Sequence, residues 1–482
     1  ATPNLTNNRP AVQHPRCPRP PPRYHRPVND PTHHPAPRRP RLFYGYIMLA
    51  VAIGMALASM PAQTVLVGLW KEPARESLGL SLAAASAAYS AATILAALPL
   101  PFVGRAADRF GLRRTVAAVA LLLVATLLLT PYAAGILTLA AAFFLLRFLG
   151  QGSLGLLAGH VVAMWFERKL GRAHALLVVG GFAAGSALTP IPTAWILDEF
   201  GWRTAMLVFA AAVALLTLPA AALLFRNRPE DIGQHLDGDP VEHAHHDTVH
   251  GGPPPPGDPA FTAQQAVRTP AYWILLLNMA AAGFIGTALL FHMAPMLRQA
   301  GLDGSPQQAA LAVQPWPIAF GLATLVVGPL ADRFAPARLL ASSSLLTISA
   351  LALCIAALVA AVPDAAVIPL MAAGMGVYGC SQALAMGVAS PTVARYFGRT
   401  HHGRIRGTVA RATVIGTGAA PWLVAAAATT ADDNFAWPFA ACALLAVPLG
   451  LASLKLTKPT PPAPIKPTPP DPDEPDPPQP DV

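Results

Sequence analysis

Two stretches of similar sequence decide the fold: GRAADRFGLRR at residues 104–114 and GPLADRFAPAR at residues 328–338. Each carries an Asp-Arg pair between a leading glycine and trailing basic residues, and each separates two long apolar runs. The two copies begin 224 residues apart, at Gly104 and Gly328. A charged loop that recurs at one place in two apolar halves indicates an internal repeat, which is typical of transporters whose halves move about a central site.

The composition of the rest of the chain is that of a membrane protein. Of its 482 residues, 54% are hydrophobic and 12% are charged, whereas soluble domains carry about a quarter charged residues. The mean hydropathy is +0.46, and many of the 52 prolines gather near the two ends and the middle of the chain. The remainder is therefore more apolar than the average, which argues against a soluble enzyme and for a bilayer as its solvent.

Apolar runs of the length that crosses a bilayer, roughly 20 helical residues, occur six times before a polar middle segment and six times after it. We therefore predict an all-α membrane protein with 12 transmembrane helices in two pseudo-symmetric six-helix bundles, at residues 42–226 and 271–456. A His- and Pro-rich linker at 227–270 joins them. The proline-rich tails at 1–41 and 457–482 are expected to be disordered, because they hold little apolar surface to bury.

The basic residues predict the orientation of the spans. If both termini are cytoplasmic, 27 of the 33 Lys and Arg residues lie in cytoplasmic segments, and the external loops hold only Lys71, Arg75, Arg203 and Arg298. Positive charge accumulates on the cytoplasmic side of membrane proteins. We therefore expect a multi-pass protein of the inner or plasma membrane with cytoplasmic termini. The scatter of the basic residues among apolar runs argues against nucleic-acid binding.

The Gly-x-x-x-Asp-Arg-x-Gly pattern of the first loop resembles the cytoplasmic loop signature of the major facilitator superfamily, and the resemblance covers residues 42–456. It implies a non-enzymatic transporter with rocker-switch alternating access. It also implies that Asp108 pairs with basic groups and caps a helix of the opposite half, and that this tie breaks in the inward-open state. The alternative is that the loop only anchors the topology. The resemblance assigns gating roles to Gly104, Asp108, Arg109, Gly111, Arg113, Gly328, Asp332 and Arg333.

Weaker features resemble one branch of this superfamily, the oxalate/formate antiporters and monocarboxylate porters. They are FYGYIML at 43–49, MPAQT at 60–64, KEPARESLGLS at 71–81, NRPEDIGQHLDG at 227–238, FHM at 291–293 and GRIRGTVARATVIGTGAAP at 403–421. In that branch, basic residues of the second half typically meet the substrate carboxylate. The eighth span of this chain, 307–330, has no basic residue, which is a departure from the pattern.

The fourth span carries a charge at depth. Its segment RFLGQGSLG, residues 147–155, resembles the Arg-x-x-x-Gln-Gly element of the superfamily, and Arg147 lies roughly 16 Å from the outer end of the span at 1.5 Å per residue. Such a charge usually faces a cavity or a partner. We expect no carboxylate deep in any span, so the partner is a backbone carbonyl, a polar side chain, water or an anionic substrate. A structural arginine is the alternative.

Other polar and aromatic side chains of the spans complete the candidate substrate site. Interruptions at Pro61, at Pro315 and Pro317, and at Gly374, Gly376 and Gly379 of the tenth span point toward the pathway, because bent helices need a cavity or protein to satisfy their backbone. His292 is either a proton shuttle or a satisfied core histidine, and Arg411 either meets the substrate or snorkels to the surface. The substrate-binding candidates are Arg147, Gln63, Tyr89, His292, Gln314, Trp316, Tyr378, Gln382 and Arg411.

The sequence thus favours a monomeric carrier of a small, monocarboxylate-like organic anion. We expect no cofactor and no metal, and the absence of a GxxxxGK[ST] loop indicates that ATP does not drive it. Exchange against a counter-anion, uniport and proton symport all stay open. One alternative is an exporter of apolar or zwitterionic compounds, with Trp316 and Phe182 lining its cavity. A second is a non-transporting sensor or scaffold that acts through the proline-rich tails.

Overall fold

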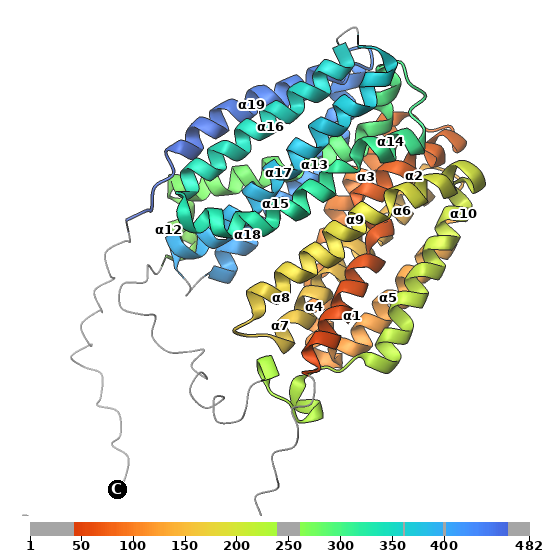
Figure 1. Cartoon of the computed structure of the whole chain (residues 1–482). Helices are drawn as coiled ribbons and strands as arrows, with labels where there is room; N and C mark the ends of the chain where they lie inside the picture. The colour runs from red at the N-terminus through yellow and green to blue at the C-terminus, as the bar shows by residue number, and fades with distance from the viewer. Residues whose placement is uncertain (1–42, 239–260, 360–361, 399–401, 461–482) are drawn as a thin grey trace, which may run out of the picture. The chain divides into compact units, whose positions relative to one another are not determined.

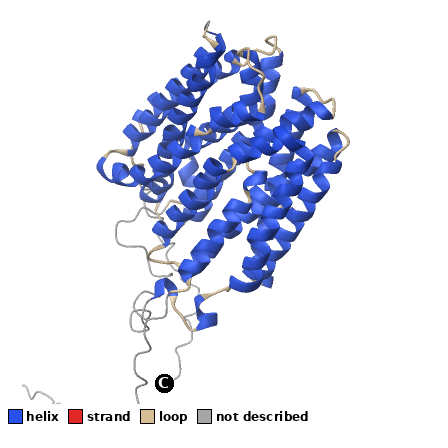
Figure 2. Cartoon of the chain, turned by 45° about the vertical axis from the view of Figure 1, so that its right-hand side comes forward, coloured by secondary structure: helices blue, strands red, loops and turns tan. Residues whose placement is uncertain are grey.

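The computed structural model describes residues 43–238, 261–359, 362–398 and 402–460. The predicted N-terminal tail, the histidines of the linker from His243 to His250 and most of the predicted C-terminal tail lie outside these residues. All regular elements of the described part are helices, as Figure 2 shows. The predicted all-α class is confirmed.

The first half forms six spans, several of which are built from more than one helical piece. They are made of α1 (Gly45–Ala58), η1 (Met60–Ala62), α2 (Thr64–Ser77), α3 (Leu82–Ala97), α4 (Leu100–Phe110), α5 (Leu112–Leu129), η2 (Thr130–Tyr132), α6 (Ile136–Leu146), η3 (Arg147–Leu154), α7 (Gly155–Trp165), α8 (Leu170–Leu177), η4 (Val178–Ala183), α9 (Ala184–Leu188), α10 (Pro190–Pro219) and η5 (Ala220–Leu224).

The second half repeats the arrangement with longer, less divided helices. Short turns η6 (Pro229–Ile232), η7 (Leu236–Gly238) and α12 (Ala263–Val267) belong to the linker region. The spans are α13 (Pro270–Gln299), α14 (Pro306–Val313), α15 (Pro315–Arg333), α16 (Pro336–Val359), α17 (Asp364–Phe397), α18 (His402–Thr429) and α19 (Ala436–Leu454).

The described helices account for the predicted spans. Eleven helical segments are long and apolar enough to cross a membrane, and one of them, Leu170–Leu224, is 55 residues long. Inside it the backbone of Gly201 has φ 76° and ψ 167°, a conformation that glycine adopts without steric cost. The chain turns back at this glycine, so the segment contains the fifth and the sixth span. The twelve-helix prediction agrees with this count.

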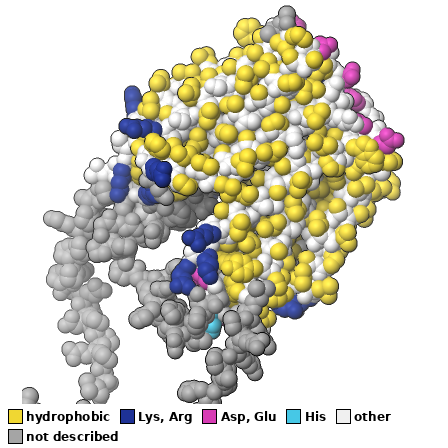
Figure 3. All heavy atoms as spheres, in the orientation of Figure 1, with side chains coloured by type: hydrophobic (Ala, Val, Ile, Leu, Met, Phe, Trp, Pro, Cys, Tyr) yellow, Lys and Arg dark blue, Asp and Glu magenta, His cyan; other side chains and the backbone are white. Residues whose placement is uncertain are grey.

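The bundle has two chemically different ends. We call the end where residues 43–45 and 455–460 lie the tail end, and the end with the 78–81 and 300–305 loops the distal end (Figure 1). In Figure 3, apolar side chains cover the flank between them, while Lys and Arg gather toward the tail end and Asp and Glu toward the distal end. An apolar flank between two charged ends suits a bilayer.

The extensive contacts between the halves are unevenly placed. They join α2 to α13 and α14, α3 to α18, α10 to α14, and the α9 and η4 pieces to α15. The helices of the first half next to the tail end, α4 and α8, have their extensive contacts within their own half. The two halves are therefore held together mainly through their distal and central parts.

Two predicted helix breaks are present and a third region is continuous. The first span is divided at Met60–Gln63 and the eighth at Gln314, as Pro61 and Pro315 predict. In contrast, the glycines of the tenth span leave α17 unbroken. One of them, Gly379, has the eighth-span backbone at Trp316 and Phe320 against its Cα, so its role is close helix packing.

Candidate functional site

The break in the first span positions the Arg147 side chain. Because the chain leaves helical geometry at Gln63 (φ −76°, ψ 147°), the Ala62 carbonyl accepts no helical hydrogen bond and faces the fourth span. Arg147 lies at the start of η3 and is 5% exposed. Its Nη1 donates to the Ala62 carbonyl at 3.5 Å and to Thr64 Oγ1 at 3.2 Å. Both bonds go to residues of the first span, as expected of a structural arginine, but they use only one of the guanidinium nitrogens.

Tyr89 completes a compact group around this arginine. The Arg147 guanidinium carbon lies 5.2 Å from the Tyr89 ring centroid, within the range of a cation–π contact. The Tyr89 hydroxyl and Thr64 Oγ1 are 3.2 Å apart. We call Thr64, Tyr89 and Arg147 the N-half polar group. Gln63 lies next to it but turns back, since its Nε2 donates to Ser59 Oγ at 3.0 Å.

The N-half polar group retains unused hydrogen-bonding capacity. A guanidinium has five N–H donors, and only Nη1 of Arg147 has partners among the described residues. The remaining nitrogens of Arg147 are not fully enclosed, whereas Thr93 Oγ1 on α3 and Gln151 Oε1 on η3 are buried without a partner. Such groups usually find a ligand or water. Helices α3 and η3, which carry them, pack against each other.

A second polar group lies in the other half. Trp316 Nε1 donates to Gln382 Oε1 at 2.9 Å, and the Tyr378 hydroxyl donates to the Ala282 carbonyl at 2.5 Å. Gly286 of α13 brings the backbone against both Tyr378 and Gln382, because a Cβ there would lie 2.9 Å from the Tyr378 oxygen. We call Trp316, Tyr378 and Gln382 the C-half polar group. The structure brings these three predicted residues together.

Two further candidates lie apart from both polar groups. Gln314 donates through Nε2 to the Ala187 carbonyl of the opposite half, and its Oε1 is buried without a partner. His292 is fully buried near the distal end, where Nε2 meets the Pro421 carbonyl at 3.0 Å and the ring packs on Phe435. The other ring nitrogen, Nδ1, is buried without a partner among the described residues, so both roles considered for His292 stay predictions.

Arg411 lies on the inter-half face of α18. Gly418, two turns farther along the same face, is in contact with Ile94 of α3. One turn from these residues toward the tail end, Ile415 is 56% and Leu98 is 68% exposed. The two helices therefore separate toward the tail end, and the exposed Arg411 side chain lies beyond the point of separation.

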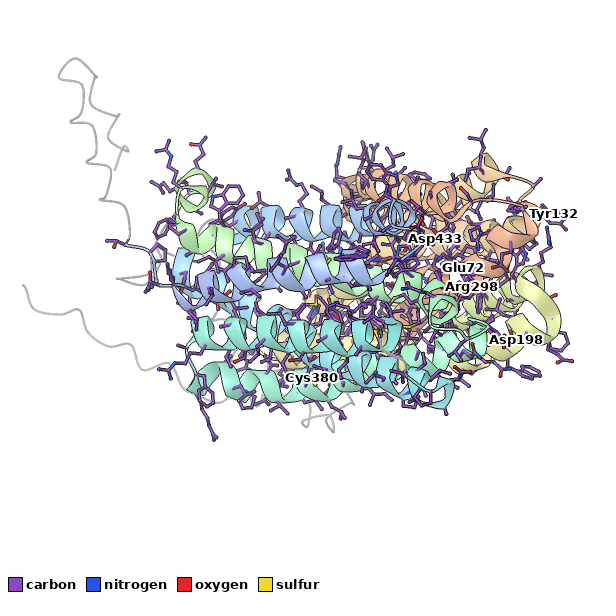
Figure 4. All side chains as sticks on the ribbon, turned by 90° about the horizontal axis from the view of Figure 1, so that it is seen from above. Glu72, Tyr132, Asp198, Arg298, Cys380 and Asp433 are labelled. Carbon is purple, nitrogen blue, oxygen red and sulfur yellow. The ribbon has the colours of Figure 1, made fainter. Side chains whose placement is uncertain are left out.

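A cluster of charges joins the halves at the distal end. Helix α2 continues to Ser77, so Lys71 and Glu72 are 1% and 3% exposed instead of lying in a loop. The Glu72 carboxylate meets Lys71, Arg75 at 3.0 Å and Arg298 of α13 at 2.6 Å. Figure 4 shows Glu72 and Arg298 side by side.

This cluster corrects two expectations from the sequence. Lys71 is not in an external loop, and the first helical span holds a buried carboxylate, Glu72. Arg298 also bonds Glu76 at 3.1 Å, so two carboxylates of α2 hold one arginine of the opposite half. We call Lys71, Glu72, Arg75, Glu76 and Arg298 the distal charge cluster. Beside it lies a cavity of about 520 Å³, lined by Arg75, Ser81, Leu82, Ala83, Pro295, Arg298, Gln299, Thr429, Asp432, Asp433 and Phe435.

Phe291 of α13 separates the distal charge cluster from the N-half polar group. Its fully buried ring lies 4.1 Å from Lys71 Nζ on one side. On the other side its centroid is 4.6 Å from that of Tyr89. An aromatic ring of the second half thus fills the space between a buried lysine and the group around Arg147.

The predicted gating loops lie at the tail end, and their charged side chains form fewer bonds than those of the distal charge cluster. Asp108 is exposed and forms no hydrogen bond or ion pair with any residue in the described ranges. Gly111 has φ 87° and caps α4, and Arg113 bonds within its own half. The Arg109 guanidinium stacks on Phe110 at 5.5 Å. The cross-half tie expected for Asp108 is not formed in this conformation.

The remaining gating candidates have open surroundings. A Cβ on Gly104 or Gly328 would meet no atom within 4 Å, so packing does not require glycine at either position here. Arg333 is the last residue of α15 and is exposed. The side chain of Asp332 lies outside the described residues. The gating roles of the two loops therefore remain predictions.

Several residues of the site were not predicted from the sequence. Thr64 bonds Arg147, Thr93 and Gln151 carry buried polar atoms without a partner on two neighbouring helices, and Lys71 and Glu72 belong to the distal charge cluster. The sequence does carry a signal for Lys71 and Glu72. Glu72 and Arg75 are three residues apart, a spacing that places them on one face of a helix, and this segment directly follows the first apolar run. The three uncharged residues carry no distinctive signal, since Thr and Gln occur throughout the spans.

Comparison with known proteins identifies the family. The sequence model of the Major Facilitator Superfamily matches residues 42–340 and 301–480. The chain therefore belongs to the Major Facilitator Superfamily, a family of transporters, and is not an enzyme. No curated protein matches it.

Solved structures share its fold at low sequence identity. A bacterial homologue of the human lysosomal transporter Spinster, inward-facing and unoccupied, has a TM-score of 0.60 and 17% identity, covering 86% of this chain and 92% of that one. The nucleoside transporter NupG has a TM-score of 0.65 and 15% identity, covering 87% of this chain and 100% of that one. At these identities the likeness shows the fold alone.

Proposed function

We propose that this transporter carries a small organic anion, monocarboxylate-like, by rocker-switch alternating access. The observation that supports the proposal is Arg147, a buried cation in a membrane span with no carboxylate partner among the described residues. An uncompensated charge at this depth costs at least ~2.5 kcal/mol. A bound carboxylate would supply the missing counter-charge and accept the unused N–H donors.

The surrounding groups fit the same substrate class. Thr93 and Gln151 offer further polar atoms beside the arginine's helix, while Trp316 and Gln382 offer an aromatic wall and an amide from the other half. A small pocket with one cation and few polar groups fixes the orientation of a short anion. Oxalate, with two carboxylates, would need a second cation, for which Arg411 is the candidate.

The unequal ends of the bundle support alternating access. We assign the tail end to the cytoplasm because it carries most of the described basic residues. In the present conformation the distal charge cluster and Phe291 close the outside. Substrate release there requires Arg298 to leave Glu72 and Glu76 as α13 moves with its half, and the Asp108 loop then closes the tail end.

Coupling to a proton or to a counter-anion is part of the proposal. Glu72 gives the chain a buried carboxylate at a helix that must move, but its three cationic partners favour the ionised form, so it takes up a proton only after Arg298 has left it. Exchange requires no such group. Uptake measured with and without a pH gradient separates the two mechanisms. Proton symport predicts that an inward proton gradient accelerates uptake. Pure exchange predicts instead that uptake depends on anion inside the vesicles.

Uptake into proteoliposomes tests the substrate class. Labelled lactate, pyruvate, formate and oxalate are supplied to the purified protein with and without a pH gradient. We expect saturable uptake of at least one, and a loss of about 100-fold or more in kcat/KM for Arg147→Gln, because a charge-assisted bond and its desolvated partner are lost. Arg203→Gln, an exposed distal arginine that bonds the Pro131 carbonyl, is the matched control. Absence of saturable anion uptake together with normal folding would reject the anion proposal.

One observation favours the alternative of an exporter of apolar or zwitterionic compounds. Arg147 already bonds Ala62 and Thr64 and stacks on Tyr89, so it also serves to hold the broken first span in place. In that case Trp316 and half-buried Phe182 face an uncharged ligand. Efflux of a lipophilic fluorescent dye that is unaffected by Arg147→Gln, with no anion uptake, would support the exporter.

A further inference from the structure

The flank of the first half has a groove at the tail end, where α5 begins and α10 ends. Its volume is about 310 Å³. The lining combines two arginines with small or apolar side chains: Arg113, Arg114, Ala117, Leu218, Ala221 and Ala222. The groove thus has a basic rim and an apolar floor at the level where a membrane span begins.

Arg113 is built into the wall of this groove. The last turns of α10 continue as the π-helix η5, whose end leaves carbonyls without helical partners. Arg113 satisfies two of them: Nε donates to the Ala221 carbonyl at 2.9 Å and Nη2 to the Ala222 carbonyl at 2.5 Å. Its backbone N–H donates to Asn227 Oδ1 at 2.9 Å. Three of its five N–H donors have no partner among the described residues.

Arg114 supplies the second charge and is free. It is exposed and forms no bond with any other residue in the described ranges. Deeper along the same two helices the surface is apolar, with Leu121 55% and Leu215 77% exposed. A ligand of this groove therefore has an anionic head at the two arginines and a hydrocarbon chain along α5 and α10.

We propose that this groove binds an anionic phospholipid, with its phosphate at Arg113 and Arg114 and an acyl chain over Ala117 and Leu218. Basic pockets between spans at the membrane surface hold such headgroups. Charge complementarity selects the anionic class, and the apolar floor selects a lipid over a free phosphate. The site is separate from the groups around Arg147 and does not rest on the nature of the transported substrate.

The second half offers an internal control. At the positions 224 residues farther along the chain, Ala337 stands in place of Arg113 and Arg338 in place of Arg114. Arg338 is likewise exposed at the start of a span. It therefore matches Arg114 in charge and setting, but the arginine that forms the groove wall is missing beside it.

Native mass spectrometry of the detergent-purified full chain tests the proposal, with phosphatidylglycerol and phosphatidylcholine of equal chain length as probes. We expect phosphatidylglycerol to bind preferentially, and Arg114→Gln to weaken it about fivefold, since a basic group near a membrane surface contributes about 1 kcal/mol. Ala117→Phe, which fills the groove and keeps both charges, should weaken binding as well. Arg338→Gln should leave it unchanged.

Three outcomes would overturn the proposal. One is an equal loss of phosphatidylglycerol binding in Arg114→Gln and Arg338→Gln, which would indicate a general surface-charge effect. Another is normal binding in Ala117→Phe, shown to be folded by its thermal unfolding. The third is full competition by soluble glycerol 3-phosphate, which would mean that the groove takes a phosphate group and not a lipid.

Discussion

The distal and tail ends of this molecule use charge in opposite ways. At the distal end, Glu72 is buried among three cations from both halves, and Arg298 crosses from α13 to reach it. At the tail end, Asp108 sits in the loop signature of the family and is exposed without a partner among the described residues. The difference shows that the loop signature at residues 104–114 makes no tie between the halves through Asp108 among the described residues, while Glu72 and Arg298 join the halves at the other end.

Burial explains why charge pairing contributes more to stability at the distal end than at the tail end. A carboxylate with several cations at 3% exposure cannot lose one partner without leaving charge in a low dielectric, whereas an exposed carboxylate is solvated whether or not it is paired. The alternating-access mechanism that we propose needs ties that can break, so it predicts contacts at the tail end that form in the opposite state and balance the distal charge cluster. The comparison can be tested from both ends.

The largest effect is expected from Glu72→Gln. It leaves the buried Lys71 without its carboxylate and takes from Arg298 one of its two carboxylates, Glu76 being the other, which should lower the free energy of unfolding by about 3 to 5 kcal/mol. Thermal unfolding in detergent measures the change. The matched control is Glu76→Gln: Glu76 bonds the same two arginines but its side chain is 53% exposed, so a loss of at most about 1 kcal/mol is expected. Equal losses in the two variants would contradict the distinction drawn from burial.

A smaller loss of stability is expected from Gly68→Val, which disturbs the packing of α2 against α13 at the distal end. Gly68 of α2 has the Leu290 carbonyl of α13 directly against its Cα, so a valine must push the two helices apart. Overpacking of this kind typically costs about 1 to 3 kcal/mol. A cysteine placed at Ala83, which is half-buried and lines the distal cavity, should then react faster with an impermeant maleimide.

The control for this packing experiment is Gly54→Val. Gly54 lies in α1 of the same span, and a Cβ there would meet nothing within 4 Å. With the same cysteine at position 83, the Gly54→Val variant should be labelled at the same rate as the chain that keeps Gly54. If Gly54→Val opens the distal end as much as Gly68→Val does, the close approach of α2 and α13 is not what holds it shut.

The smallest effect on stability is expected from Asp108→Asn. Since this carboxylate has no partner among the residues that the structure describes, thermal unfolding should shift by less than about 0.5 kcal/mol. The transport rate should nevertheless fall, because the tie predicted for Asp108 belongs to the opposite state. A large loss of stability with an unchanged rate would show that the loop is structural in this conformation and does not gate.

The fold was predictable from particular residues because hydropathy and the repeat are local properties. The runs around the GRAADRFGLRR and GPLADRFAPAR loops predicted the spans, and Pro61 and Pro315 predicted where two of them break. Arg147 was predictable as a site candidate because a charge at that depth is costly wherever its partners lie. Its partners, the Ala62 carbonyl and Thr64, were not, since they depend on how two helices approach.

The same limit explains the errors. The first span was expected to end before Lys71 because a lysine and a glutamate together read as a loop, yet α2 continues and buries both. The surroundings of His292 were not predictable either: its ring is fully buried against Phe435 and its Nε2 meets the Pro421 carbonyl, because the rotation of a helix decides which neighbours a side chain meets. Helix rotation is set by packing against neighbours and leaves no trace in hydropathy.

The sequence by itself determined the class of protein, the number of spans and the duplicated architecture, since each follows from the free energy of moving residues between water and hydrocarbon one segment at a time. Only the tertiary structure decided which charges meet across the halves, which end is closed and where the arginines face a groove. Those outcomes depend on contacts between residues more than 200 positions apart, such as Glu72 with Arg298. Whether such charges attract strongly or hardly at all is fixed by the burial that packing creates.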